Sequence, residues 1–230
     1  MDKININKIL NREFQETKLK KALMDFEKNK KDILISRGFY VFGEPGIGKT
    51  KFVENILEEL NYDVVSYNAS NIRNKNIIEM ITKHNMSDTN ILSLFKSEKK
   101  KIAILMDEID GLSNGDKTAL SSLIKMVRSK KTKKQKLEEI TYVPIICVGN
   151  YQNDKKIKEL RKVSTCIELK KPKKCELKDL IEYLIPKVSS DEKEYIIENI
   201  DGDLRKLSMI NEIHNKNKYF NNDKNIIKRE

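Results

Sequence analysis

The sequence contains few of the residues that most often build metal sites, disulfide frameworks and catalytic triads. Its 230 residues include two histidines, three cysteines and no tryptophan. Cys147, Cys166 and Cys175 are odd in number and do not have a zinc-finger spacing, which is typical of a reducing compartment. With only His84 and His214, the sequence argues against a histidine-based metal site or a serine-type triad.

Long apolar segments are also missing. No run approaches the roughly 20 apolar residues that a bilayer helix needs, and the first ten residues, MDKININKIL, lack a signal-peptide core. Hydrophobic residues make up 38% and charged residues 35%, which excludes a fibrous or collagen-like chain but suits a highly charged globular one. We therefore expect a soluble, intracellular protein without a membrane segment.

Positive charge is in excess. The 46 lysines and arginines outnumber the 35 aspartates and glutamates and give a net charge of +11, which attracts polyanions, above all nucleic acid. Frequent use of Lys, Asn and Ile, all with AT-rich codons, is an alternative source of this charge. The run KMVRSKKTKKQK (residues 125–136) suits a solvated loop, a nuclear-import signal or a DNA-facing surface.

Five short apolar runs predict β-strands because they are rich in β-branched and aromatic residues. Segments with helical spacing separate the first four of them. This alternation predicts an α/β fold with a parallel five-stranded sheet covered on both faces. The runs are FYVF (39–42), DVVSY (63–67), IAILM (102–106), VPIICV (143–148) and TCIEL (165–169).

Beyond Pro172 the pattern indicates only helices. One of them follows a capping box formed by Ser189 and Glu192, and the last strong one opens at Asp203. We expect three parts in the chain. They are an α/β nucleotide-binding domain with a helical lead-in (1–172), a small all-helical lid (173–214) and a polar tail (215–230).

The most specific motif is GEPGIGKT, which has the G-x4-G-K-T spacing of a phosphate-binding loop and lies between a predicted strand and a predicted helix. Its glycines let main-chain N–H groups surround phosphates, and the helix N-terminus adds its dipole. Lys49 would neutralise phosphate oxygens and Thr50 would ligate Mg²⁺. The predicted cofactor-binding residues are Gly43, Glu44, Pro45, Gly46, Ile47, Gly48, Lys49 and Thr50.

Other polar residues follow the later strands. Asp107 and Glu108 end an apolar strand, where we expect Asp107 to hold Mg²⁺ and Glu108 to act as general base. Asn150 follows the next strand and would orient water or touch the γ-phosphate, although Gly-Asn taken alone favours an ordinary turn. Arg205 opens the last strong helix and would reach the same phosphate, although a lone helix arginine is usually a surface charge.

Taken together, GEPGIGKT, NASNIR, LMDEIDG, a strand ending in Asn and GDLRKL resemble the AAA+ ATPases, and most closely the replication factor C clamp loaders and their large subunit. The resemblance extends from about residue 38 to 214. It implies a P-loop NTPase AAA+ core that binds ATP and Mg²⁺ through the residues above. Within this pattern Asp107 and Glu108 form the second Walker motif, Asn150 is sensor 1 and Arg205 is sensor 2.

The same resemblance implies the partners. These are other AAA+ clamp-loader subunits, a sliding clamp and primed double-stranded DNA, with ATP-dependent loading of the clamp as the function. The family's small subunits carry a Ser-Arg-Cys motif whose arginine enters a neighbour's ATP site, whereas this sequence has Ser164-Thr165-Cys166. We therefore expect hydrolysis to need an arginine from a partner subunit, and we assign no such role to Arg161.

Two further sets of contacts follow from the resemblance. Arg73, Lys75 and Lys117 are candidates for contacts with DNA phosphates, the alternative being solvated helix charges. Ile91, Leu92 and Phe95 have the short apolar spacing of a clamp-binding segment, the alternative being a core helix that packs inward.

The sequence departs from the family in two places. No segment of the length of the family's helical collar follows residue 214, so we expect a minimal or viral paralogue, a fragment, or assembly through the AAA+ domains and partner collars. The N-terminal segment lacks the family's usual aromatic-Lys-Tyr-x-Pro motif, which leaves the residues of the adenine pocket unassigned.

The alternative functions are another AAA+ DNA remodeller, such as a helicase loader or branch-migration motor, and a nucleotide-latched interaction subunit that scarcely hydrolyses ATP. The expected location is the nucleus of a cell, or the replication site of an infected cell if the protein is viral.

Overall fold

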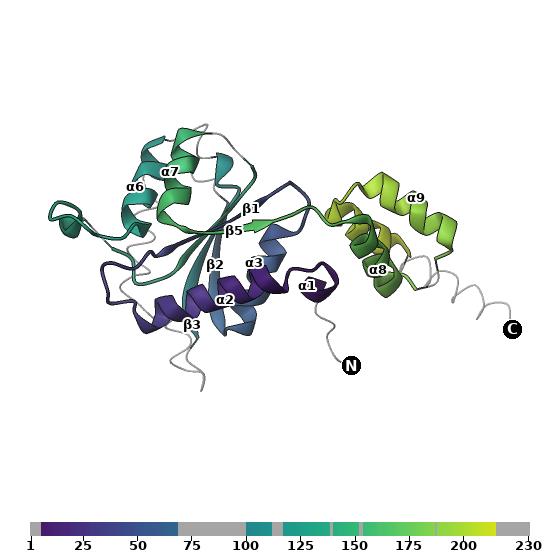
Figure 1. Ribbon diagram of the computed structural model, residues 1–230, viewed down its shortest axis with the longest axis horizontal. Coiled ribbons are helices and arrows are strands. Elements are labelled where there is room, and N and C mark those ends of the chain that lie inside the picture. The colour runs from purple at the N-terminus through teal and green to yellow at the C-terminus, as the bar shows by residue number, and fades with distance from the viewer. Residues whose placement is uncertain are drawn as a thin grey trace, which may run out of the picture. The chain divides into compact units, whose positions relative to one another are not determined.

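The computed structural model describes residues 6–68, 100–111, 117–138, 140–151, 154–186 and 188–214. The chain forms two compact units, which Figure 1 shows as ribbons. The sheet unit comprises Phe14–Gly43 and Lys49–Leu169. The helical unit comprises the chain up to Glu13, the short segment Glu44–Gly48 and the chain from Lys170.

A five-stranded sheet with the strand order β2-β3-β4-β1-β5 is the centre of the sheet unit, and its pairings are parallel. This confirms the predicted parallel five-stranded sheet. The residues of β1 are buried without alternation, as expected for a strand that is covered on both faces. The strands are β1 (Gly38–Gly43), β2 (Tyr62–Asn68), β3 (Lys101–Asp107), β4 (Ile145–Gly149) and β5 (Thr165–Leu169).

Helices cover both faces of this sheet (Figure 1). Leu120, Leu123 and Ile124 of α6 are buried against Ile104 and Ile145 in the main core. Figure 1 shows α6 and α7 on one side of the sheet and α2 on the other. The helices of this unit are α2 (Glu13–Lys28), α3 (Lys49–Glu59), α6 (Lys117–Val127) and α7 (Lys155–Val163), with a short 3₁₀ helix at Gln135–Leu137.

The helical unit contains α1 (Ile6–Ile9), α8 (Lys174–Leu184), α9 (Ser190–Ile200) and a helix over residues 204–214. It has its own small core, to which Leu10, Leu180 and Leu207 contribute. Ser189 caps α9 by accepting a hydrogen bond from the Glu192 amide, and the Glu192 side chain accepts one from the Ser189 amide. Among the helices of the described ranges, none has the length and apolar character needed to cross a bilayer.

Candidate nucleotide-binding site

The glycine-rich segment has a backbone that only glycine adopts readily. Gly46 and Gly48 have φ angles of +77° and +80°, in the left-handed region. A Cβ atom on Gly46 would lie 2.4 Å from the Asp203 carboxylate. The Leu204 amide donates a hydrogen bond to the Gly46 carbonyl oxygen at 2.8 Å, so the helix that carries Arg205 starts directly against this loop.

Arg12 is a buried cation beside the same loop. Its side chain is 4% exposed, and its Nη1 donates to the Ile47 carbonyl oxygen at 2.9 Å. Within the described residues its buried Nη2 has no hydrogen-bond partner. Burial lowers the pKa of Arg12 to about 10, an effect that the nearby Glu176 carboxylate opposes, so the group is still charged at neutral pH. An unsatisfied buried guanidinium nitrogen fits an anionic ligand.

Lys49, in contrast, belongs to the sheet unit, where it is the first residue of α3 and is 8% exposed. Its Nζ donates to the Gly43 carbonyl oxygen at 3.2 Å and to Asn150 Oδ1 at 2.8 Å. The ammonium group therefore connects the end of β1 with the residue that follows β4. The phosphate-binding role of Lys49 stays a prediction.

Thr50 and Asp107 lie side by side next to Lys49. The Thr50 hydroxyl donates to Asp107 Oδ2 at 2.8 Å, and Asp107 Oδ1 accepts a hydrogen bond from the Glu108 amide at 2.8 Å. A hydroxyl and a carboxylate oxygen are the kinds of ligand that Mg²⁺ prefers in phosphate-binding sites. The residues present therefore fit the predicted magnesium ion.

The Glu108 carboxylate has an unexpected partner. Asn68, the last residue of β2, donates from Nδ2 to Glu108 Oε2 at 3.1 Å. Glu108 is exposed and has a φ angle of +53°, an uncommon conformation for a residue with a side chain, of the kind that occurs at functional sites. The sequence assigned Asn68 no role at this site, so its contact with Glu108 was not predicted.

Asn150 is held in one orientation by Asp110. The backbone amide of Asn150 donates to both Asp110 oxygens, at 2.9 and 3.1 Å, and its Nδ2 donates to Asp110 Oδ2 at 2.8 Å. With its Nδ2 bound to Asp110, the amide oxygen faces Lys49. Gly149 is needed for this approach because a Cβ there would lie 2.4 Å from Asp110 Oδ1. The sequence assigned no role to Asp110.

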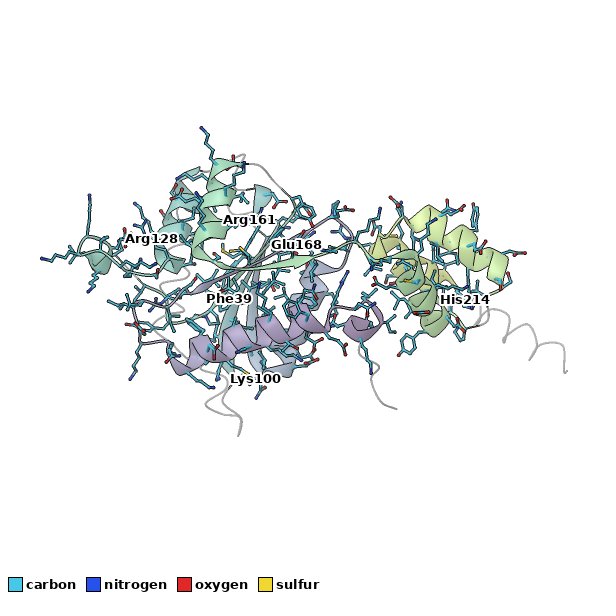
Figure 2. All side chains as sticks on the ribbon, in the orientation of Figure 1. Phe39, Lys100, Arg128, Arg161, Glu168 and His214 are labelled. Atoms are coloured by element: carbon cyan, nitrogen blue, oxygen red, sulfur yellow. The ribbon has the colours of Figure 1, made fainter. Side chains whose placement is uncertain are left out.

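The two remaining arginines differ in their surroundings. Arg205 is exposed, and its amide donates to Asp203 Oδ1 at 2.9 Å at the start of the helix over residues 204–214. The guanidinium of Arg161 (labelled in Figure 2) lies over the Phe42 ring, 4.1 Å from its centroid. Arg161 is therefore engaged within its own unit.

Several predicted contacts lie outside the described residues. These are Arg73 and Lys75 for DNA, and Ile91, Leu92 and Phe95 for a clamp. Lys117 is the first residue of α6, but the structure does not describe its side chain. All of these assignments stay predictions.

Comparison with known proteins adds independent findings. A family model described as "ATPase family associated with various cellular activities (AAA)" matches residues 39–170. Replication factor C subunit 1 of Saccharomyces cerevisiae is 27% identical over 184 residues, which cover 73% of this chain and 20% of that protein. The human subunit 1 is 32% identical over 56% of this chain and 10% of its own length. The replication factor C large subunit of Pyrobaculum neutrophilum is 30% identical over 63% of this chain and 31% of its own length. These matches thus span a third or less of each relative.

Proposed function

The chain belongs to the AAA family of ATPases, and on this premise we propose that it is a clamp-loader subunit that uses ATP to help load a sliding clamp onto primed DNA. The family membership supports ATP hydrolysis in general. The similarity to replication factor C large subunits supports the loading role. The main observation in support of ATPase activity is that Lys49, Asp107 and Asn150 lie at the carboxyl ends of β1, β3 and β4. This is the edge at which open α/β sheets bind ligands.

The triphosphate is held by the main-chain amides of Gly43–Gly48 and by Lys49. Gly46 and Gly48 fit this role because their φ angles let the amides point toward a bound anion. Thr50 and Asp107 are the residues that would hold Mg²⁺, which neutralises phosphate charge when it is bound. Arg12 supplies a further buried positive charge beside Ile47.

In the proposed hydrolysis, Glu108 accepts the proton of the attacking water, and Asn150 orients that water or the γ-phosphate. Asp110 acts on Asn150 and not on substrate, so it is a positioning residue. Asn68 directs the Glu108 carboxylate through its hydrogen bond. Arg205, in the same unit as loop residues 44–48, contacts the γ-phosphate as the second sensor.

Full turnover requires an arginine from a neighbouring AAA+ subunit. The stretch Ser164-Thr165-Cys166 offers none, and Arg161 is stacked on Phe42. Such a donated arginine raises phosphoryl-transfer rates by about 10³ to 10⁵ in related enzymes. We accordingly propose hetero-oligomeric partners and a replication site as the place of action, the nucleus for a cellular protein.

DNA and the clamp are engaged by residues outside the described ranges or with undescribed side chains. Arg73, Lys75 and Lys117 contact template phosphates, and Ile91, Leu92 and Phe95 insert into a pocket of the clamp. Phosphate contacts of this kind are independent of sequence and sensitive to salt.

The decisive experiment is a pull-down of purified sliding clamp by the tagged protein assembled with small AAA+ clamp-loader subunits. We expect retention of the clamp with ATP, and its loss in Phe95→Ala while ATP binding persists. Lys101→Ala serves as the matched control, because this exposed side chain lies outside every proposed contact. If the wild-type assembly retains no clamp but binds ATP and DNA, another AAA+ DNA-remodelling role replaces the clamp-loader assignment.

A further inference from the structure

A lysine-rich loop extends from the sheet unit between α6 and β4, shown in teal at the left of Figure 1. We call residues 131–137 the lysine loop. Four exposed side chains, those of Lys131, Lys133, Lys134 and Lys136, give it a dense positive charge. Within the described part of the chain, none of these four ammonium groups has an ion-pair partner.

The base of the lysine loop is fixed by a charge cluster. Glu138 accepts hydrogen bonds from Arg128 (labelled in Figure 2) and from Lys130 Nζ, the latter at 3.0 Å. Lys130 is fully buried, and its amide donates to the Ile33 carbonyl oxygen at 2.8 Å. The Arg128 hydrogen bond lowers the pKa of Glu138, so this carboxylate stays ionised at neutral pH. The Glu138 carboxylate is thus occupied by two cations at the base of the loop.

The lysine loop is also ordered internally. Gln135 Oε1 accepts hydrogen bonds from the amides of Lys131 and Thr132, at 3.0 and 3.1 Å. In return, the Thr132 hydroxyl accepts one from the Gln135 amide at 3.2 Å. A single 3₁₀ turn, Gln135–Leu137, follows. The preformed turn therefore holds four positive charges close together, although their mutual repulsion disfavours this arrangement.

We propose that the lysine loop binds the phosphate backbone of nucleic acid through Lys131, Lys133, Lys134 and Lys136. A row of phosphates offers closely spaced single negative charges, which independent lysine side chains match without a fixed geometry. The net charge of +11 draws the same ligand toward the protein. Preorganisation of the turn by Gln135 reduces the entropy lost on binding.

This surface is separate from the nucleotide site. The lysine loop precedes β4, whereas Asn150 follows it, and a strand of five residues spans roughly 16 Å. Binding through the loop therefore needs neither ATP nor a clamp. The inference adds a second nucleic-acid contact to the proposed function, and its test is independent of loading.

The test is a salt titration of duplex-DNA binding by the full-length protein without nucleotide, followed by fluorescence anisotropy. The loop variant replaces Lys131, Lys133, Lys134 and Lys136 by Ala. The control variant carries the same charge change at four exposed lysines elsewhere on the sheet unit, Lys21, Lys28, Lys155 and Lys158. We expect the loop variant to bind at least about tenfold more weakly at 0.1 M salt, with the slope of log K against log salt reduced by about 3. The control should keep the wild-type slope.

A variant without a change of charge tests whether the preformed turn contributes to binding. Gln135→Ala leaves all lysines in place, so we expect weaker binding by roughly threefold with an unchanged salt slope. Thermal unfolding checks that the loop and control variants are folded. If both folded variants had equal slopes of log K against log salt, the proposal would be overturned. It would also fail if the loop variant lost binding to vesicles containing phosphatidylserine while its affinity for DNA stayed at the wild-type value.

Discussion

Lys49 Nζ and Asn150 Oδ1 lie 2.8 Å apart, which joins the lysine of the glycine-rich motif to the polar residue that follows β4. Lys49 Nζ also donates a hydrogen bond to the carbonyl oxygen of Gly43. Both are neutral oxygens that a phosphate oxygen can replace, because a charged acceptor forms the stronger hydrogen bond with an ammonium group. We therefore expect Asn150 to respond to a bound nucleotide through Lys49, and the prediction for Asp110 below follows from this expectation.

Glu108→Gln should abolish turnover but keep nucleotide binding. The amide has the size of the carboxylate but cannot accept a proton, and loss of a general base lowers rates by about 10² to 10⁴. Phosphate release, measured with the partner subunits present, and binding of a fluorescent ATP analogue separate the two effects. If wild type and variant are equally inactive in the assembly, the protein is a nucleotide-latched subunit and not an ATPase.

Asp110→Ala should slow turnover through Asn150. Asp110 is 8% exposed and accepts hydrogen bonds from both the backbone and the side chain of Asn150. Without it the Asn150 amide loses its orientation, and we expect kcat to fall about tenfold with little change in KM. Asn150→Ala should have a similar effect, and the double variant should be no worse than either single one. Additive losses would show that Asp110 acts by another route.

The parts predicted from the sequence are those encoded by local patterns. GEPGIGKT identified the loop because its spacing and its place between strand and helix are both local, and the five apolar runs identified the sheet for the same reason. Arg12, Asn68 and Asp110 were missed as site residues because each is a single polar residue whose role depends on a distant partner. Arg12, for example, contacts Ile47, and no periodicity marks such a pair.

The lysine-rich run at residues 125–136 is a second case in which the sequence alone did not identify tertiary contacts. Its composition suits a solvated loop, yet Lys130 is fully buried and both Lys130 and Arg128 pair with Glu138. Only tertiary structure separates the charges that hold the loop from the charges that remain on its surface.

Arg12→Ala should weaken ATP binding. The guanidinium lies beside the glycine loop with one nitrogen lacking a partner in the described residues, and a hydrogen bond to a charged group contributes about 1.5 to 3 kcal/mol. We expect Kd to rise at least about tenfold in a titration with a fluorescent ATP analogue. Lys8→Ala, at an exposed site of the same unit, is the control for loss of charge. An unchanged Kd in folded Arg12→Ala protein would exclude a contact with nucleotide.

Glu138→Gln should destabilise the sheet unit, with a defined pH dependence. The change leaves the Lys130 side chain, 1% exposed, without its carboxylate partner, and we expect a loss of about 2 kcal/mol in the free energy of unfolding at pH 7. Because pairing lowers the pKa of Glu138, its contribution is present above the unfolded-state pKa of about 4.3 and is lost as the pH falls through the lower folded-state pKa. Urea unfolding at pH 7 and pH 3 should therefore show a difference in stability between variant and wild type that is smaller at pH 3.

Glu159→Gln is the control variant. It breaks only a partly exposed pair with Lys156 and should change the free energy of unfolding by less than about 0.5 kcal/mol. Equal losses in the two variants, or a loss at Glu138 that persists unchanged at pH 3, would contradict a stabilising ion cluster at the base of the lysine loop.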